Sequence, residues 1–183
     1  MTPLELLWNG WRATYVQSLT AASVPHVGDA APRHSIFTEI LHSGLPDVDT
    51  HVLHRGRHCW ALLNAYPYAV GHLLVLPYRE VADLEDLESV ESVELWAMVT
   101  DAVRALKTAL APGGLNVGLN LGRPAGGSVS GHLHVHVVPR WVGDANFMTT
   151  TSNTRTLPES LPDTAAKLRA AWPTVPPVGA PRS

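Results

Sequence analysis

The chain has 183 residues, of which 45% are hydrophobic, and this supports one well-packed core but not two ordinary domains. Its 13 basic and 16 acidic side chains give a net charge of −3, which excludes the broad positive surface that binds nucleic acid or anionic membranes. No apolar run reaches the roughly 20 residues of a membrane span. Recognition of a phosphate group must therefore be local.

The first residues predict a short amphipathic helix, because Trp8, Trp11 and Tyr15 are spaced by three and four positions. Glu5 interrupts the apolar stretch and no basic leader precedes it, so this segment does not resemble a secretory signal. Cys59 is the single cysteine and cannot form a disulfide within its own chain. These features fit a reducing compartment, and we expect a cytoplasmic protein.

Four short extended runs, bounded by Gly, Pro or Asn, predict strands at residues 58–64, 71–77, 115–121 and 132–138. Between the second and third runs, apolar side chains recur every three or four positions and predict one face of a helix of about six turns. They are Val90, Val93, Trp96, Val99, Val103, Leu106 and Leu110. A proline and two glycines at 112–114 would end this helix by removing a donor and offering positive φ. A helix on a meander-like sheet is an α+β architecture.

Three histidines alternate with apolar residues in the last of these runs. Along a strand, His132, His134 and His136 would share one face, at intervals of about 6.6 Å. The opposite face, which would enter the core, carries Leu133, Val135 and Val137. A strand face that aligns three titratable rings indicates a functional site.

Three interpretations of this histidine face remain open. It is a solvated strand surface, a zinc site formed by histidines at i and i+2, or a site of covalent catalysis in which a neutral histidine attacks phosphorus. No Asp, Glu or Cys lies close in sequence as a further zinc ligand. Residues 116–128 read as a strand that opens into a glycine-rich loop, whose backbone N–H groups can approach an anion. This loop favours catalysis on a phosphate.

Two motifs resemble the histidine triad family. HLHVHVV at 132–138 matches its His-x-His-x-His signature followed by two apolar residues, and residues 61–77 resemble its strand, turn and strand that begins with Gly-His. The likeness to the family domain covers about residues 37–140. It implies an α+β, HIT-like fold, with an antiparallel sheet of about five strands and a long helix packed on it.

The resemblance also suggests how the chain divides. We expect an amino-terminal helix and loop extension over residues 1–32 and the family domain over 33–150. Residues 151–183 would form a carboxy-terminal segment, with a short helix near 163–172 and a disordered, proline-rich tail.

Within the family, the chain is most similar to the diadenosine tetraphosphate phosphorylases of actinobacteria. The shared segments include NVGLNLG, AGGS, HLHVHVVPRW and GDANF. This likeness implies cleavage of dinucleoside polyphosphates by inorganic phosphate to ADP and ATP, through an adenylyl-histidine. The alternatives are a hydrolase that uses water, acting on the same substrates or on nucleoside phosphoramidates, and a nucleotide-binding module without catalysis.

Family roles carry over to matching positions. His134 would be the nucleophile, His136 would contact the attacked phosphate, and His132 would hold the tautomer of the nucleophile. The substrate-binding positions implied by the resemblance are Asn64, His72, Asn120, Gly127, Ser128 and Trp141. Asn64 could instead be a turn residue, His72 a satisfied histidine at a strand start, and Trp141 a core or oligomer contact.

Two departures from the family pattern bear on the chemistry. Ser128 stands where many members carry Gln, and its shorter side chain would leave room for inorganic phosphate. Ser35 and Thr38 stand where some relatives bind structural zinc through Cys-x-x-Cys, so we predict no structural zinc. We expect no required cofactor, leave open a divalent cation that accompanies the substrate, and expect a homodimer or homotetramer.

Overall fold

The computed structural model describes residues 34–126, 129–144 and 158–174. The predicted aromatic helix at Trp8, Trp11 and Tyr15 lies outside the described residues, as do Gly127 and Ser128. The predicted division into extension, family domain and tail therefore stays a prediction.

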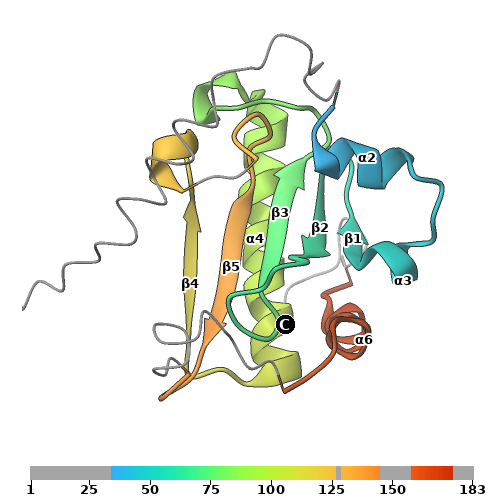
Figure 1. Ribbon diagram of the computed structural model, residues 1–183, viewed down its shortest axis with the longest axis vertical. Coiled ribbons are helices and arrows are strands. Elements are labelled where there is room, and N and C mark those ends of the chain that lie inside the picture. Colours follow the sequence, from blue (N-terminus) through green and yellow to red (C-terminus); the bar gives the residue numbers. More distant parts are fainter. Residues whose placement is uncertain (1–33, 127–128, 145–157, 175–183) are drawn as a thin grey trace, which may run out of the picture. The chain divides into compact units, whose positions relative to one another are not determined.

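A five-stranded antiparallel sheet forms the centre of the described chain (Figure 1). Its strands are β1 (Val52–Arg55), β2 (Cys59–Leu63), β3 (Leu73–Pro77), β4 (Gly114–Leu119) and β5 (Val135–Arg140). The predicted α+β fold is confirmed. The strand order is β1-β2-β3-β5-β4, so the expected meander is wrong at one point, because β5 inserts between β3 and β4. The sequence did not predict β1, which has only four residues and too few alternations to stand out.

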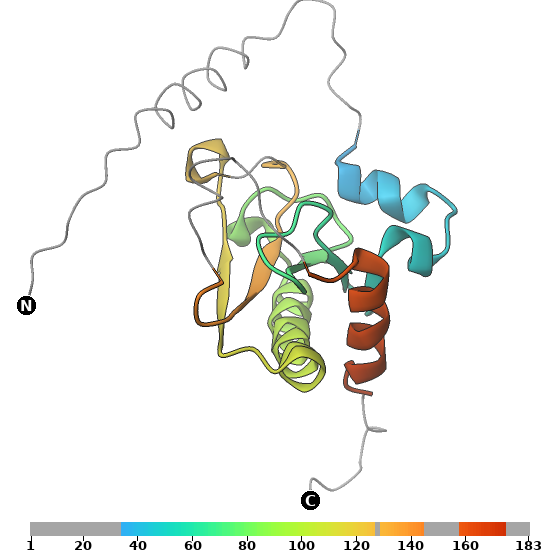
Figure 2. The ribbon, with the colours of Figure 1, turned by 60° about the horizontal axis from the view of Figure 1, so that its bottom comes forward.

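Helices cover both faces of this sheet. The 22-residue α4 (Ser89–Leu110) packs on one face, and α6 (Leu161–Ala171) lies beside it (Figure 2). The position of α6 agrees with the helix predicted near 163–172. Two short helices that the sequence did not predict, α2 (Ile36–His42) and α3 (Asp47–Thr50), precede the sheet.

Local chemistry fixes both ends of α4. The Glu91 carboxylate accepts the backbone N–H of Glu88 at 2.8 Å, in a capping box, and Arg79 pairs with the same carboxylate at 2.6 Å. At the other end Ala111 takes the left-handed conformation, with φ of 45°. Pro112 disfavours the helical conformation in the residue before it, and the positive φ falls at Ala111, two residues before the first of the expected glycines.

The predicted buried face of α4 is wrong in its first half. Val90, Val93 and Trp96 are exposed, at 52%, 73% and 44%. The face against the sheet carries Leu95, Met98, Val99, Ala102, Ala105 and Leu106. Alanine allows the helix backbone to approach the sheet closely, and a pattern weighted toward large apolar side chains does not identify such a face.

Strand alternation builds two apolar clusters, one on each side of the sheet. The cluster under α4 and α6 takes Cys59, Ala61 and Leu63 from β2, together with Leu133, Val135 and Val137. The cluster under α2 consists of Phe37, Val52, Trp60, Leu62, Leu74 and Leu76. Burial, with smaller contributions from Glu94 and Glu91, raises the pKa of the Cys59 thiol to about 12.

Within the described residues, no helix has both the length and the apolar character needed to cross a bilayer.

Replacing Leu95 with Ala should lower the free energy of unfolding by about 2–5 kcal/mol, because Leu95 is fully buried on the sheet-facing side of α4 and its loss leaves a cavity. The matched control Val93→Ala, two positions away on the same helix, should change it by less than about 0.5 kcal/mol. Urea denaturation measures both. Equal losses would contradict the observed orientation of α4.

Candidate active site

The three histidines lie on the sheet face that α2 covers, but only His136 belongs to β5. The strand begins at Val135, so the prediction that His132 and His134 lie within it is wrong. Instead, the chain before β5 curves over the end of β3, where the Leu133 N–H donates to the carbonyl of Val81. As predicted, the intervening apolar residues enter the core. The rings of His134 and His136 converge, with centroids 4.9 Å apart.

His134 is buried rather than exposed, with only 7% of its surface accessible. Its Nδ1 lies 2.8 Å from the carbonyl oxygen of His132, and since a carbonyl only accepts, Nδ1 carries the proton. The Nε2 atom therefore keeps its lone pair. Burial lowers the pKa of this imidazole, although the bond to the His132 carbonyl opposes the effect. The ring is thus held neutral, in the tautomer that a nucleophile at Nε2 requires.

His132 is fully buried, and its ring is held at both nitrogens. Nε2 donates to the carbonyl of Pro77 at 2.9 Å, so Nδ1 accepts the hydroxyl proton of Ser35 at 2.7 Å. The Ser35 oxygen also accepts the N–H of Thr38 at 3.2 Å and caps α2. His132 therefore fixes the tautomer of His134 through its carbonyl, while its ring anchors the segment to β3 and α2.

His136 is held in the opposite tautomer by His72. The Tyr68 N–H donates to His72 Nδ1 at 3.0 Å, so the proton of neutral His72 sits on Nε2. That N–H donates to His136 Nδ1 at 2.9 Å, which leaves the proton of neutral His136 on Nε2. Burial, with a smaller contribution from His134, lowers the pKa of His136 to about 4. A lone pair on His134 and an N–H donor on His136 thus lie side by side.

A small apolar pocket of about 290 Å³ adjoins the two rings. His134, His136, Asn64 and Asn120 line it on the polar side. Its apolar wall includes Ile36, Phe37, Ile40, Leu62, Leu74 and Val129. His51 also lines the pocket, and its buried Nδ1 has no hydrogen-bond partner among the described residues. An apolar slot with a few polar groups fits the base and ribose of one nucleoside.

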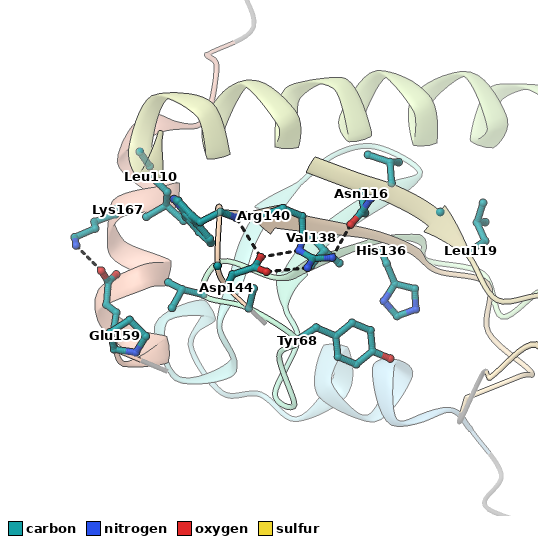
Figure 3. A pocket seen from close by; sticks show the side chains of 18 of the residues that line it. Tyr68, Leu110, Asn116, Leu119, His136, Val138, Arg140, Asp144, Glu159 and Lys167 are labelled. Carbon is teal, nitrogen blue, oxygen red and sulfur yellow. Dashed lines mark hydrogen bonds and ion pairs between the residues drawn. The ribbon is translucent and has the colours of Figure 1, made fainter. Parts of the chain in front are cut away.

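A larger cleft of about 1030 Å³ meets this pocket at His136, Tyr68 and Asn120, the residues that line both. Figure 3 shows His136 and Tyr68 in this cleft. Trp141, which the sequence placed beside the substrate, lines the cleft and not the small pocket. The nucleophile candidate His134 lines only the small pocket. The reacting atoms therefore lie near the junction of two cavities.

The remaining predicted residues occupy different settings. Asn64 accepts the N–H of Tyr66 at 2.9 Å, which is the turn role considered for it, and also faces the small pocket. Asn120 Nδ2 lies 3.4 Å from His136 Nε2, and since two donors cannot pair, the proton assigned to His136 Nε2 requires the Asn120 amide to turn its oxygen toward the ring. His72 is fully buried and contacts His136 rather than either cavity. Gly127 and Ser128 lie outside the described residues.

Sequence reasoning missed Phe37, whose ring packs 5.5 Å from His132 and 5.2 Å from His134. It also missed the bond between Ser35 and His132, and the parts played by Tyr68 and His51. No local motif marks these contacts. The neighbouring sequence also does not predict the left-handed backbone conformation of His51, with φ of 58°.

The positions that bind structural zinc in some relatives hold hydroxyl groups here. Ser35 Oγ and Thr38 Oγ1 lie 3.3 Å apart, and Ser35 is engaged with His132 Nδ1. Neutral hydroxyls are not among the usual zinc ligands, and no group of three His, Cys, Asp or Glu side chains suited to a metal occurs among the described residues. This donor set does not fit structural zinc, whose absence stays a prediction.

Comparison with known proteins identifies the family. The HIT domain family model matches residues 46–142. The chain belongs to the histidine triad (HIT) family. A Mycobacterium tuberculosis protein named AP-4-A phosphorylase is 46% identical over 169 residues, which cover 92% of this chain and 85% of that protein. The expected resemblance to the family and to its phosphorylases is thereby confirmed.

Two further relatives show the breadth of the HIT family. A zinc-bound histidine triad protein from Mycobacterium smegmatis has the same fold, with a TM-score of 0.60 and 28% identity over 75% of this chain and 91% of that one. The asymmetrical bis(5'-nucleosyl)-tetraphosphatase of Schizosaccharomyces pombe is 33% identical over 97 residues, 53% of each chain. HIT proteins similar to this one thus carry both phosphorylase and tetraphosphatase names.

At pH 7.5, ¹⁵N-resolved NMR of the histidine rings should find the proton of His134 on Nδ1 and that of His136 on Nε2. The variant His72→Phe should leave His134 unchanged but allow His136 to populate both tautomers, because the N–H donated to its Nδ1 is lost. A proton on Nε2 of His134 in the wild-type protein would refute the assignment.

The free energy of unfolding should decrease as the pH falls from about 6.5 to 5. His132, His134 and His136 all have lowered pKa values in the folded protein, so the unfolded chain binds protons first. Each group can contribute up to about 1.4 kcal/mol per pH unit. Urea denaturation at pH 7.5 and 5.5 measures the loss.

The variant His132→Asn should show a smaller dependence on pH, since one buried titrating ring is removed. His42→Asn is the matched control, because His42 is exposed at the end of α2. The same slope in all three proteins would mean that these rings do not titrate as their burial requires.

Proposed function

We propose that this HIT protein cleaves diadenosine tetraphosphate by phosphorolysis to ADP and ATP, through a covalent adenylyl group on His134. The observation that carries the proposal is the unprotonated Nε2 of a buried, neutral His134, which lies beside the N–H donor of His136 at a nucleoside-sized pocket. The 46% identity to a protein named AP-4-A phosphorylase supports the choice of substrate.

In the first half-reaction, the lone pair of His134 Nε2 attacks the α-phosphorus. An N–P bond forms, the P–O bond to the bridging oxygen breaks, and its electron pair leaves with ATP. The Nδ1–H bond to the His132 carbonyl stabilises the positive charge that develops on the imidazole. His136, neutral because its pKa is about 4, donates a hydrogen bond from Nε2 to the phosphate oxygens.

In the second half-reaction, an oxygen of inorganic phosphate attacks the same phosphorus. The N–P bond breaks, its electron pair returns to His134 Nε2, and ADP leaves. Two successive displacements at one phosphorus predict ping-pong kinetics. The sequence-based roles of Asn64 at the ribose, and of Asn120, Gly127 and Ser128 along the phosphates, belong to this proposal.

Some finer points rest on sequence features and on the family resemblance. They are the cytoplasmic location, the assembly as a homodimer or homotetramer, the absence of a required cofactor, and a divalent cation that accompanies the nucleotide. We retain them as expectations within the proposed function.

Hydrolysis is the second candidate, favoured by the similarity to a tetraphosphatase. Water would replace phosphate in the second half-reaction, and the products would be AMP and ATP. The first half-reaction, and with it the role of His134, would be unchanged.

Incubation of the purified protein with diadenosine tetraphosphate should yield ADP and ATP only when inorganic phosphate is present, as chromatography of the products would show. His134→Ala should reduce turnover by at least about 10⁴-fold, because the substitution removes the unprotonated nitrogen that lies beside the N–H donor of His136. AMP and ATP, formed regardless of phosphate, would replace phosphorolysis with hydrolysis.

The control for the mutation is mass spectrometry of the wild-type protein after incubation without phosphate. It should detect one adenylyl group, which His134→Ala lacks while its circular dichroism stays native. A His134→Ala protein that still turns over substrate would exclude covalent catalysis at this residue.

A further inference from the structure

The larger cleft begins at His136 and runs along β5 and β4 toward α6. On β5, the alternate residues His136, Val138 and Arg140 all line it, with Arg140 about 13 Å from His136 at the usual rise of a strand. In Figure 3, His136 and Tyr68 lie at one end, and Glu159 and Lys167 lie at the other. The volume of about 1030 Å³ is at the upper end of the range for small-molecule sites.

The cations that line the cleft are already neutralised. Arg140 forms two bonds to Asp144, of 2.7 and 2.8 Å, and a third to the side-chain oxygen of Asn116 at 3.0 Å. Lys167 pairs with Glu159 at 2.6 Å. A lining whose positive charges are each paired does not select for a phosphate group at this end of the cleft.

The rest of the lining suits a nucleoside. Apolar groups come from Leu110, Val117, Leu119 and Val138, and aromatic rings come from Tyr68 and Trp141. Purine bases stack on aromatic rings, and ribose hydroxyls pair with amides such as that of Asn116. The larger cleft therefore favours an uncharged group that has an apolar face and polar edges.

Gly118 lines the cleft beside His136. It lies within β4, directly opposite His136 in the strand pairing. A Cβ atom built at Gly118 meets nothing within 4 Å, so a side chain there would extend into open space beside His136. Glycine weakens a strand interior and often occurs where a ligand approaches the backbone closely.

We propose that this cleft binds the second nucleoside of a dinucleoside polyphosphate, which departs as part of the nucleoside triphosphate. The inference rests on the proposed function, since it takes the first nucleoside to occupy the small pocket with its α-phosphorus at His134. The junction at His136, Tyr68 and Asn120 is where the phosphate chain crosses from one cavity to the other. The cleft thus selects dinucleotides over AMP conjugates with small leaving groups.

The test compares two substrates of the purified full-length protein. One is diadenosine tetraphosphate, and the other is adenosine 5'-phosphoramidate, whose leaving group is a single ammonia molecule. The quantity measured is the ratio of their kcat/KM values, with both reactions supplied with phosphate. Gly118→Val should lower this ratio at least about tenfold, because the new side chain occupies the passage.

Gly114→Val is the matched control. Gly114 begins the same strand, its Cβ would also meet nothing within 4 Å, and it does not line the cleft. Its ratio should stay within about twofold of the wild-type value. A ratio that is also unchanged in Gly118→Val overturns the proposal.

Trp141→Ala provides a second variant, at the end of the cleft away from the reacting atoms. This variant should lower the ratio as well. If Gly118→Val disturbs His136 and lowers kcat/KM equally for both substrates, the ratio measured for Trp141→Ala tests the proposal in its place. An unchanged ratio there overturns the cleft site while the proposed function stands. A wild-type protein that does not cleave diadenosine tetraphosphate refutes the proposed function itself, and the inference with it.

Discussion

The pairing of β3 with β5 determines the geometry of the site. The register that aligns Leu74 with His136 sets His72 beside His136 and brings the Pro77 carbonyl to His132. A slip of one residue would turn the histidines into the apolar cluster under α4 and expose the core residues. Because β5 is the last strand in sequence but lies between β3 and β4, the site forms only once β5 has paired with β3.

Around this pairing the protein sets the reactivity of the imidazole rings through their tautomers, that is, through which nitrogen carries the proton, rather than through their charge. Burial keeps all three rings neutral, and each proton is directed by a backbone group: the His132 carbonyl for His134, the Pro77 carbonyl for His132, and the Tyr68 amide, through His72, for His136. In surroundings of low dielectric constant, such oriented dipoles act more strongly than in water. The arrangement needs no reorganisation when charge develops at phosphorus.

The parts that sequence predicted are those with a local signal. Alternation and Gly or Pro boundaries located four strands, and the triad signature located the histidines. The sequence did not reveal that His132 and His134 precede the strand, since the same alternation fits an extended segment without a partner. The Ser35–His132 and His72–His136 bonds span 97 and 64 residues, and no short-range pattern encodes such contacts. The sequence pattern did not identify the buried face of α4, because Ala102 and Ala105 on that face are small and only weakly hydrophobic.

A single oxygen atom, Ser35 Oγ, serves two structures at once. It accepts the bond that starts α2, and it donates the bond that orients His132. Because α2 supplies Ile36, Phe37 and Ile40 to the nucleoside pocket, a substitution at Ser35 changes both the stability of α2 and the geometry of the catalytic site. Residue 35 must therefore meet two requirements, the cap of α2 and the hydrogen bond to His132. Threonine is the one replacement whose side chain keeps a hydroxyl group of the same reach.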